Sequence, residues 1–222
     1  MKKFISAFIA CSLALLTFAS CGSKSKDDKK DGKTADIEGK WALSDVPDSE
    51  INSAGLIFGN NGSGSMYEET SSIFSFSGDS MNLYGYAIDK EYIKEENDVV
   101  TVTLRDSNII VMKRLESSGN GFDGKYSLSG GSLYDSLSQA VASKDGKTDI
   151  TVELSDGHSF VIFNDLFTYK TKGKDLVISG CSPLIMPSAD ENSDEISAEY
   201  KVEGDKLTII DDKNTNVLTK VA

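Results

Sequence analysis

Histidine is almost absent from this chain of 222 residues, which contains only His158. Zinc sites, haem ligation and serine-type catalytic triads depend on histidine as a ligand or a general base. One histidine therefore excludes most of that chemistry before any motif is considered. We predict neither a cofactor nor a metal site.

Positive charge is in deficit. Lys and Arg total 23 against 35 Asp and Glu, which gives a formal net charge of −12. A surface this acidic disfavours nucleic acid and anionic polymers and mainly promotes solubility. We predict no nucleic-acid partner.

The chain also lacks, at its N-terminal end, an apolar run long enough to span a bilayer comfortably. Residues 4–19 are apolar apart from three hydroxyl side chains, whereas a spanning helix needs about 20 such residues. A basic start, an apolar middle and small residues at the end predict a secretory signal peptide over residues 1–20. The Gly, Ser, Lys and Asp residues that follow predict a disordered tether over residues 21–37.

The end of the apolar segment, Thr17-Phe18-Ala19-Ser20-Cys21, resembles the lipobox of bacterial lipoproteins, in which small residues precede an obligatory cysteine. Phe18 stands where that family usually has Leu. The resemblance implies that the Cys21 thiol carries diacylglycerol and that the chain is cut just before it. We predict an exported protein anchored by lipid to the outer face of the bacterial cell membrane or to the outer membrane. The alternative is an ordinary signal peptide with an unrelated cysteine at the cut.

Disulfides are excluded on the lipoprotein interpretation. Of the three cysteines, Cys11 leaves with the signal peptide and Cys21 carries lipid, so Cys181 has no partner within the chain. A lone cysteine of this kind is more often a small buried apolar residue than a reactive thiol.

The chain contains an internal repeat. Gly39-Lys40-Trp41-Ala42-Leu43-Ser44 is echoed by Gly124-Lys125-Tyr126-Ser127-Leu128-Ser129, and further blocks recur in the same order. This order predicts a duplication, with repeat 1 over residues 38–116 and repeat 2 over residues 121–222. The sequence leaves open whether the repeats form two separate barrels or share one sheet.

Strand signals dominate both repeats. Short β-branched runs are bounded by turn residues, and hairpin dipeptides recur at Asn61-Gly62, Asp156-Gly157 and Gly204-Asp205. The close spacing of turns predicts an all-β fold of antiparallel meanders, closed or nearly closed. One short helix is also predicted, with Ser132 as its N-cap and an apolar stripe of Leu133, Leu137, Ala140 and Val141.

The ends of each repeat resemble the lipocalin-type β-barrel, which has a Gly-x-Trp in its first strand and a basic residue on its last. In that family the Trp closes one end of the barrel and the basic residue packs across it. The resemblance implies this role for Gly39, Trp41 and Arg114 in repeat 1. In repeat 2, Tyr126 replaces Trp and Lys220 replaces Arg. The closest likeness is to short lipocalin-like domains of bacterial lipoproteins whose function is unknown.

Candidate catalytic and metal-binding groups are few. Asp156, His158 and Ser159 are adjacent at a hairpin, where neighbouring side chains point apart, so an exposed turn histidine is favoured over a catalytic set. The acidic stretch 190–195 lacks the ordered spacing of a calcium loop and favours a solvated loop. Core packing is favoured over a glycan or lipid groove for the strand aromatics Phe58, Tyr67, Phe74, Phe76, Tyr84, Tyr86 and Tyr92.

These observations predict a lipid-anchored protein of the cell envelope with a non-enzymatic binding or interaction role. Binding of a small hydrophobic ligand inside a barrel is one form of that role. The alternative is a protein–protein interaction, assembly or inhibitor module that has no ligand cavity. Its partners would be the membrane, reached through Cys21, and an envelope protein or a small hydrophobic ligand.

Overall fold

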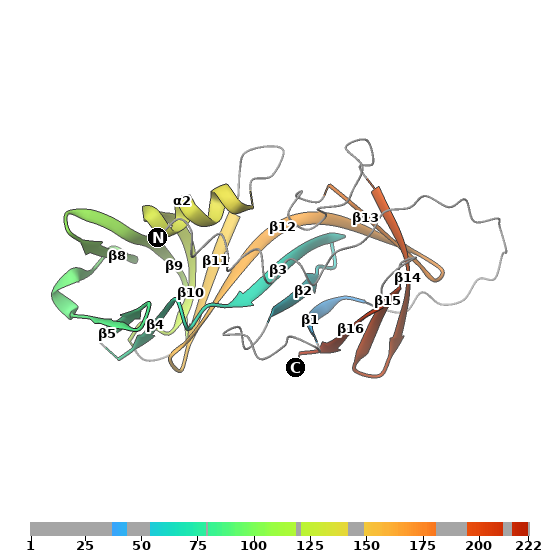
Figure 1. Ribbon diagram of the computed structural model, residues 1–222, viewed down its shortest axis with the longest axis horizontal. Coiled ribbons are helices and arrows are strands. Elements are labelled where there is room, and N and C mark those ends of the chain that lie inside the picture. Colours follow the sequence, from blue (N-terminus) through green and yellow to red (C-terminus); the bar gives the residue numbers. More distant parts are fainter. Residues whose placement is uncertain are drawn as a thin grey trace.

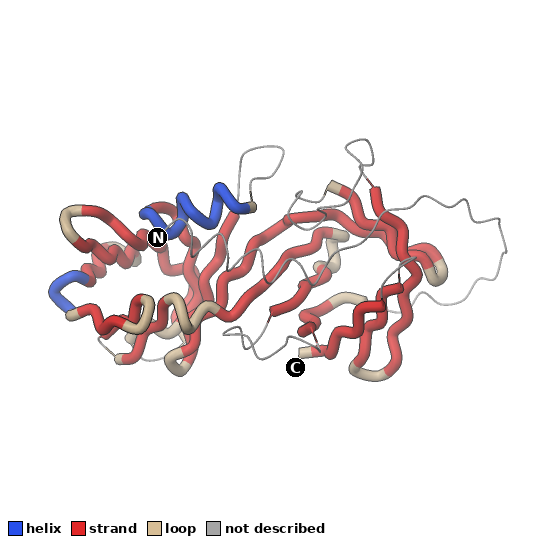
Figure 2. Tube along the Cα trace, in the orientation of Figure 1, coloured by secondary structure: helices blue, strands red, loops and turns tan. Residues whose placement is uncertain are grey.

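The computed structural model describes residues 37–43, 54–78, 80–118, 121–141, 149–180, 195–210 and 215–221. The signal peptide, Cys21, nearly all of the tether, Cys181 and most of the acidic stretch lie outside these residues. The described chain is mostly strand, which confirms the all-β class (Figure 2). No helix in these ranges is both long and apolar enough to cross a membrane.

Many consecutive strands are joined by two-residue hairpin turns, as at Asp156-Gly157 and at Gly204-Asp205 (Figure 1). The strands are β1 (Gly39–Leu43), β2 (Ala54–Phe58), β3 (Ser63–Glu69), β4 (Phe74–Ser77), β5 (Ser80–Leu83), β6 (Tyr86–Ile88), β7 (Ile93–Glu96), β8 (Val99–Leu104), β9 (Ser107–Ser117), β10 (Gly124–Gly130), β11 (Asp149–Ser155), β12 (His158–Lys172), β13 (Asp175–Ser179), β14 (Glu195–Glu203), β15 (Lys206–Ile210) and β16 (Thr215–Lys220). The helices in the described ranges are the 3-10 turn η2 (Lys90–Tyr92) and the α-helix α2 (Gly131–Ala140).

Helix α2 lies where the sequence predicts a helix, and the described part of its apolar stripe is buried: Leu133, Leu137 and Val141. The predicted N-cap is wrong. The helix begins at Gly131 after an extended Gly130, and Ser132 lies in its first turn. Gly131 has a φ of +90°, and a Cβ there would lie 2.5 Å from the Ile109 carbonyl oxygen. Only glycine lets the chain turn directly from β10 into the helix.

One antiparallel sheet of 13 strands crosses the whole molecule, in the order β13-β14-β15-β16-β1-β2-β3-β12-β11-β10-β9-β8-β7. Strand β13 also pairs with β12, so β12, β13, β14, β15, β16, β1, β2 and β3 close into a ring. We call this part ring A. The remaining strands, β7–β11 with the first part of β12, and the separate three-stranded sheet β4-β5-β6 form half B (Figure 1). The two repeats therefore share one sheet.

The repeats exchange strands. Ring A takes β1–β3 from repeat 1 and β12–β16 from repeat 2, whereas half B combines β4–β9 of repeat 1 with β10, β11 and the start of β12. The first and last strands of the chain, β1 and β16, are consequently neighbours in the sheet. Each structural half is built from both halves of the sequence, so the predicted repeat boundary does not separate two structural units.

Strands β3 and β12 carry the chain from one half to the other, and they pair with each other about an approximate two-fold axis. Tyr67 is opposite Ile162, its counterpart in the second repeat, at an offset of 95 residues (from 67 to 162). The glycines of the preceding hairpin turns follow the same offset, with φ of +81° at Gly62 and +80° at Gly157. The two flanking pairs are related by the same offset. It converts the pair of Met66 and Phe163 into the pair of Val161 and Glu68.

Side chains fill the interior of ring A. Alternate residues of its strands are buried in one apolar cluster: Trp41, Leu56, Phe58, Met66, Phe167, Leu176, Ile178, Leu207, Ile209 and Leu218. The Phe58 ring makes edge-to-face contacts, with centroids 5.8 Å from Phe167 and 5.0 Å from Tyr169. A Cβ on Gly64 would lie 1.9 Å from the Phe167 ring, so that ring packs on bare backbone. An eight-stranded ring is just wide enough for side chains to fill it in this way.

Candidate functional site

Two pairs of an aromatic and a basic residue join the first strand of one repeat to the last strand of the other. Trp41 is opposite Lys220, whose Nζ lies 5.4 Å from the Trp ring centroid. Tyr126 is opposite Arg114, whose Cζ lies 5.0 Å from the Tyr ring centroid. The lipocalin resemblance implied the other combination, Trp41 with Arg114 and Tyr126 with Lys220. Strand exchange is the reason for the difference, because it places β1 beside β16 and β10 beside β9.

The polar tips of the two buried aromatics are bonded in the same way. Trp41 Nε1 donates to the carbonyl oxygen of Ile37 at 2.8 Å, and the Tyr126 hydroxyl donates to that of Phe122, also at 2.8 Å. Burial raises the pKa of Tyr126 to about 12, although the Arg114 guanidinium nearby acts to lower it. These pairs join neighbouring strands of the large sheet.

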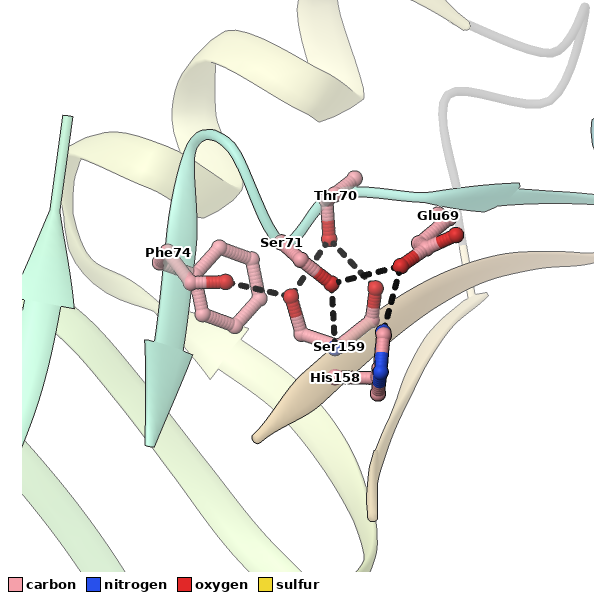
Figure 3. Close-up of polar contacts among 6 residues, drawn as sticks. All are labelled: Glu69, Thr70, Ser71, Phe74, His158 and Ser159. Carbon is pink, nitrogen blue, oxygen red and sulfur yellow. Dashed lines mark hydrogen bonds and ion pairs between the residues drawn. The ribbon is translucent and has the colours of Figure 1, made fainter. Parts of the chain in front are cut away.

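A polar cluster lies where the chain leaves β3 for β4 and meets the start of β12 (Figure 3). His158 Nδ1 is 2.7 Å from Oε1 of Glu69, which also accepts a hydrogen bond from Ser71 Oγ at 2.9 Å. The His158 side chain is 58 % exposed and that of Glu69 only 7 %. The histidine is therefore largely exposed, as the sequence predicts, but it contacts a buried carboxylate from the other repeat.

Ser159 belongs to the same cluster but does not face His158 as a nucleophile would (Figure 3). Its hydroxyl is buried and donates to the carbonyl oxygen of Phe74, and its backbone N–H donates to Ser71 Oγ at 3.0 Å. The Thr70 backbone N–H donates to the Ser159 carbonyl oxygen at 2.7 Å. These hydrogen bonds take the place of regular strand-pairing bonds where the chain leaves the large sheet after β3 and enters β4.

The hydrogen bonds of this cluster therefore hold the two repeats together. Sequence reasoning missed Glu69, Thr70 and Ser71, although the polar run of residues 68–72, between Tyr67 and Ile73, was a signal of a strand interruption. The positions related by the 95-residue offset hold different chemistry, because Asn164, Asp165 and Leu166 stand there within the continuous strand β12. The described residues contain no group of three or more His, Cys, Asp or Glu that could hold a metal ion.

Replacing Ser159 with alanine is expected to lower the free energy of unfolding by about 1–3 kcal/mol, because the buried Phe74 carbonyl loses its donor. Urea unfolding followed by Trp41 fluorescence measures the change, and Trp41 is the only tryptophan in the chain. Ser136→Ala in α2, whose hydroxyl donates at the surface to the Ser132 carbonyl oxygen of its own helix, is the control and should change stability by less than about 0.5 kcal/mol. Equal stability of the two variants would show that the Ser159 hydrogen bonds do not stabilise the contact between the repeats.

Most of the strand aromatics are buried as predicted, but two lie at the surface. Phe58, Tyr67, Phe74 and Phe76 are at most 3 % exposed. Tyr86 in β6 and Tyr92 in η2 are 74 % and 43 % exposed, respectively, so both are available to a partner.

Comparison with protein-family models, with curated proteins and with solved structures gives no match. The fold and the polar cluster are therefore interpreted from the contacts of this chain alone.

Proposed function

We propose that this protein is lipidated at Cys21, held in the bacterial cell envelope, and acts as a non-enzymatic interaction module that needs no internal ligand cavity. The filled interior of ring A is the observation that carries the second part. Trp41, Phe58, Phe167 and other side chains occupy the space in which a lipocalin-type barrel would hold a ligand. Recognition then has to take place on the outer surface.

The bonding of the polar cluster supports the absence of a hydrolase-type reaction. The Ser159 and Ser71 hydroxyls are each hydrogen-bonded to backbone or carboxylate groups, and neither forms a hydrogen bond with His158. A nucleophilic serine requires a base within hydrogen-bond reach of its hydroxyl. The hydrogen bonds of this cluster support a structural role.

Replacing Cys21 with alanine is expected to move the protein from the membrane fraction to the soluble fraction. The change removes the acyl chains, each buried CH₂ of which contributes about 0.8 kcal/mol to membrane binding. Detergent phase partitioning of cells that express each form measures the shift. Cys181→Ala is the matched control and should stay with the membrane, since it leaves the other cysteine in place. Membrane retention of the Cys21→Ala protein would contradict the anchor.

Native mass spectrometry of the protein purified from envelopes distinguishes the interaction module from a ligand carrier. A filled ring predicts the mass of the lipidated chain alone once detergent has been removed. A small hydrophobic molecule that is retained in a fixed 1:1 ratio would favour the carrier and would overturn the cavity-free proposal.

A further inference from the structure

Strand β6 has an edge that no strand of the described residues covers. It pairs with β5 on one side only. Tyr84 and Gly85, with φ of +52° and +79°, form the two-residue turn between β5 and β6. In such a hairpin the pair next to the turn is hydrogen-bonded and the following pair is not. The backbone N–H and C=O of Ala87 therefore point away from β5.

In repeat 1 the 3-10 turn η2 separates β6 from β7 and leaves the β6 edge in a sheet of its own. In ring A the corresponding strand β14 is continuous, pairing with β13 through its first part and with β15 through its second. In half B the three residues 90–92 form η2 between β6 and β7. Strands β6 and β7 consequently belong to different sheets.

The two strands that flank η2 differ in how their edges are protected. Strand β7 carries Lys94, Glu95 and Glu96, and charged side chains of this kind deter the addition of another strand. Strand β6 reads Tyr-Ala-Ile and has no charge. Its backbone is therefore the more receptive edge.

The surroundings of β6 combine exposed aromatics with carboxylates. Tyr86 and Tyr92 are exposed, and Asp89 and Glu91 lie between them in the sequence. A hydrogen bond with Glu91 raises the pKa of the Tyr92 hydroxyl. Residues 86–98 contain five carboxylates and two lysines, in a chain whose net charge is −12. Tyrosine faces and carboxylates both favour lysine and arginine, whereas a second acidic copy is repelled.

We propose that the β6 edge takes up an extended segment of a partner protein that bears lysine or arginine, as an added antiparallel strand. This inference rests on the proposed interaction role and assigns it a surface and a partner chemistry. Main-chain bonds to Ala87 give the segment its register, and its basic side chains meet the two tyrosines and the carboxylates of Asp89 and Glu91. The strand is three residues long, so few main-chain bonds form and weak binding is expected.

The test uses the full mature chain in detergent and two fluorescent ten-residue peptides, one alternating Lys with Val and the other Glu with Val. Fluorescence polarisation should show binding of the basic peptide and at least about tenfold weaker binding of the acidic one. Ala87→Pro should weaken the basic peptide by at least about tenfold, since it removes an outward N–H and leaves the β5 ladder intact. Tyr86→Ser should weaken binding about threefold to tenfold.

Glu95→Pro in β7 is the matched control, because Glu95 follows the same pairing rule beside the turn at Asn97 and Asp98 and also has an outward N–H. The affinity of this variant for the basic peptide should lie within about threefold of that of the unchanged protein. Loss of binding in Glu95→Pro with retention in Ala87→Pro would move the site to β7 and overturn the assignment. Equal binding of both peptides would overturn the basic partner.

Sedimentation velocity tests whether a second copy of this chain occupies the β6 edge. Self-association that Ala87→Pro abolishes would make a second copy the occupant and would contradict the proposal. If neither peptide binds, this inference fails, whereas the proposed function is judged separately by the Cys21→Ala fractionation and the native mass. If a retained ligand overturns the cavity-free function, the peptide measurements still decide the β6 edge.

Discussion

Residues 38–118 and 121–222, produced as separate polypeptides, are each expected to remain unfolded or to aggregate. Mixed during refolding, they should form a 1:1 complex with the unfolding transition of the intact protein. The reason is the strand exchange, because ring A closes only when β1–β3 join β12–β16. Repeat 1 alone would leave Trp41 without its neighbour strand β16, and repeat 2 alone would leave Tyr126 without β9.

Near-ultraviolet circular dichroism and size-exclusion chromatography measure the outcome. The control is the intact chain with a protease site inserted between Ser118 and Gly121 and cut after folding. The cut protein should keep its native spectrum, because the exchanged strands hold the two pieces together. A monomeric, cooperatively unfolding fragment of either repeat would show that each repeat can close on itself and would contradict the exchange.

Replacing Gly55 with alanine is expected to destabilise the protein by about 3 kcal/mol or more, or to prevent folding. A Cβ at this position would lie 1.9 Å from the Trp41 carbonyl oxygen and 2.9 Å from the Tyr67 ring. A side chain could rotate away, but a carbonyl in the β1–β2 ladder cannot. Relief requires β1 to move, which disturbs the contact between Trp41 and Lys220 that joins the ends of the chain.

Urea unfolding monitored by fluorescence of the single tryptophan reports this change directly, because Trp41 lies beside the substituted residue. Gly130→Ala is the matched control. Its Cβ would meet nothing closer than 3.6 Å, and its φ is extended, so the cost should be at most about 1 kcal/mol. Unchanged unfolding of the Gly55→Ala protein would show that β1 and β2 are not packed as described.

The sequence predicts the local elements well because their causes are local. Asp156-Gly157 and Gly204-Asp205 do form hairpin turns, since the glycines adopt positive φ without steric cost. The apolar stripe of α2 is buried, because spacing alone puts Leu133 and Leu137 on one face. The N-cap was missed because Gly131 takes a backbone conformation that depends on the approach of β9, from a distant part of the chain.

The pairing of strands is not decided by the local sequence. Two repeats with the same strand pattern can each close on themselves or exchange strands, and the apolar alternation is the same in both cases. Only the tertiary structure places Trp41 beside Lys220 and Tyr126 beside Arg114. It also brings Glu69 to His158 across 89 residues of sequence, a contact that no local spacing specifies.

What the sequence alone determined is the all-β class, the turns and the scarcity of histidine and positive charge; the duplication stays a prediction. What only the tertiary structure decided is which copies of the strands meet, which side chains fill ring A and that β6 has an edge unpaired by any other described strand. The physical reason is that hairpins and turns depend on neighbouring residues. Closure of a sheet instead depends on long-range register, and the 3-10 turn η2 between β6 and β7 marks where these two strands pass into different sheets.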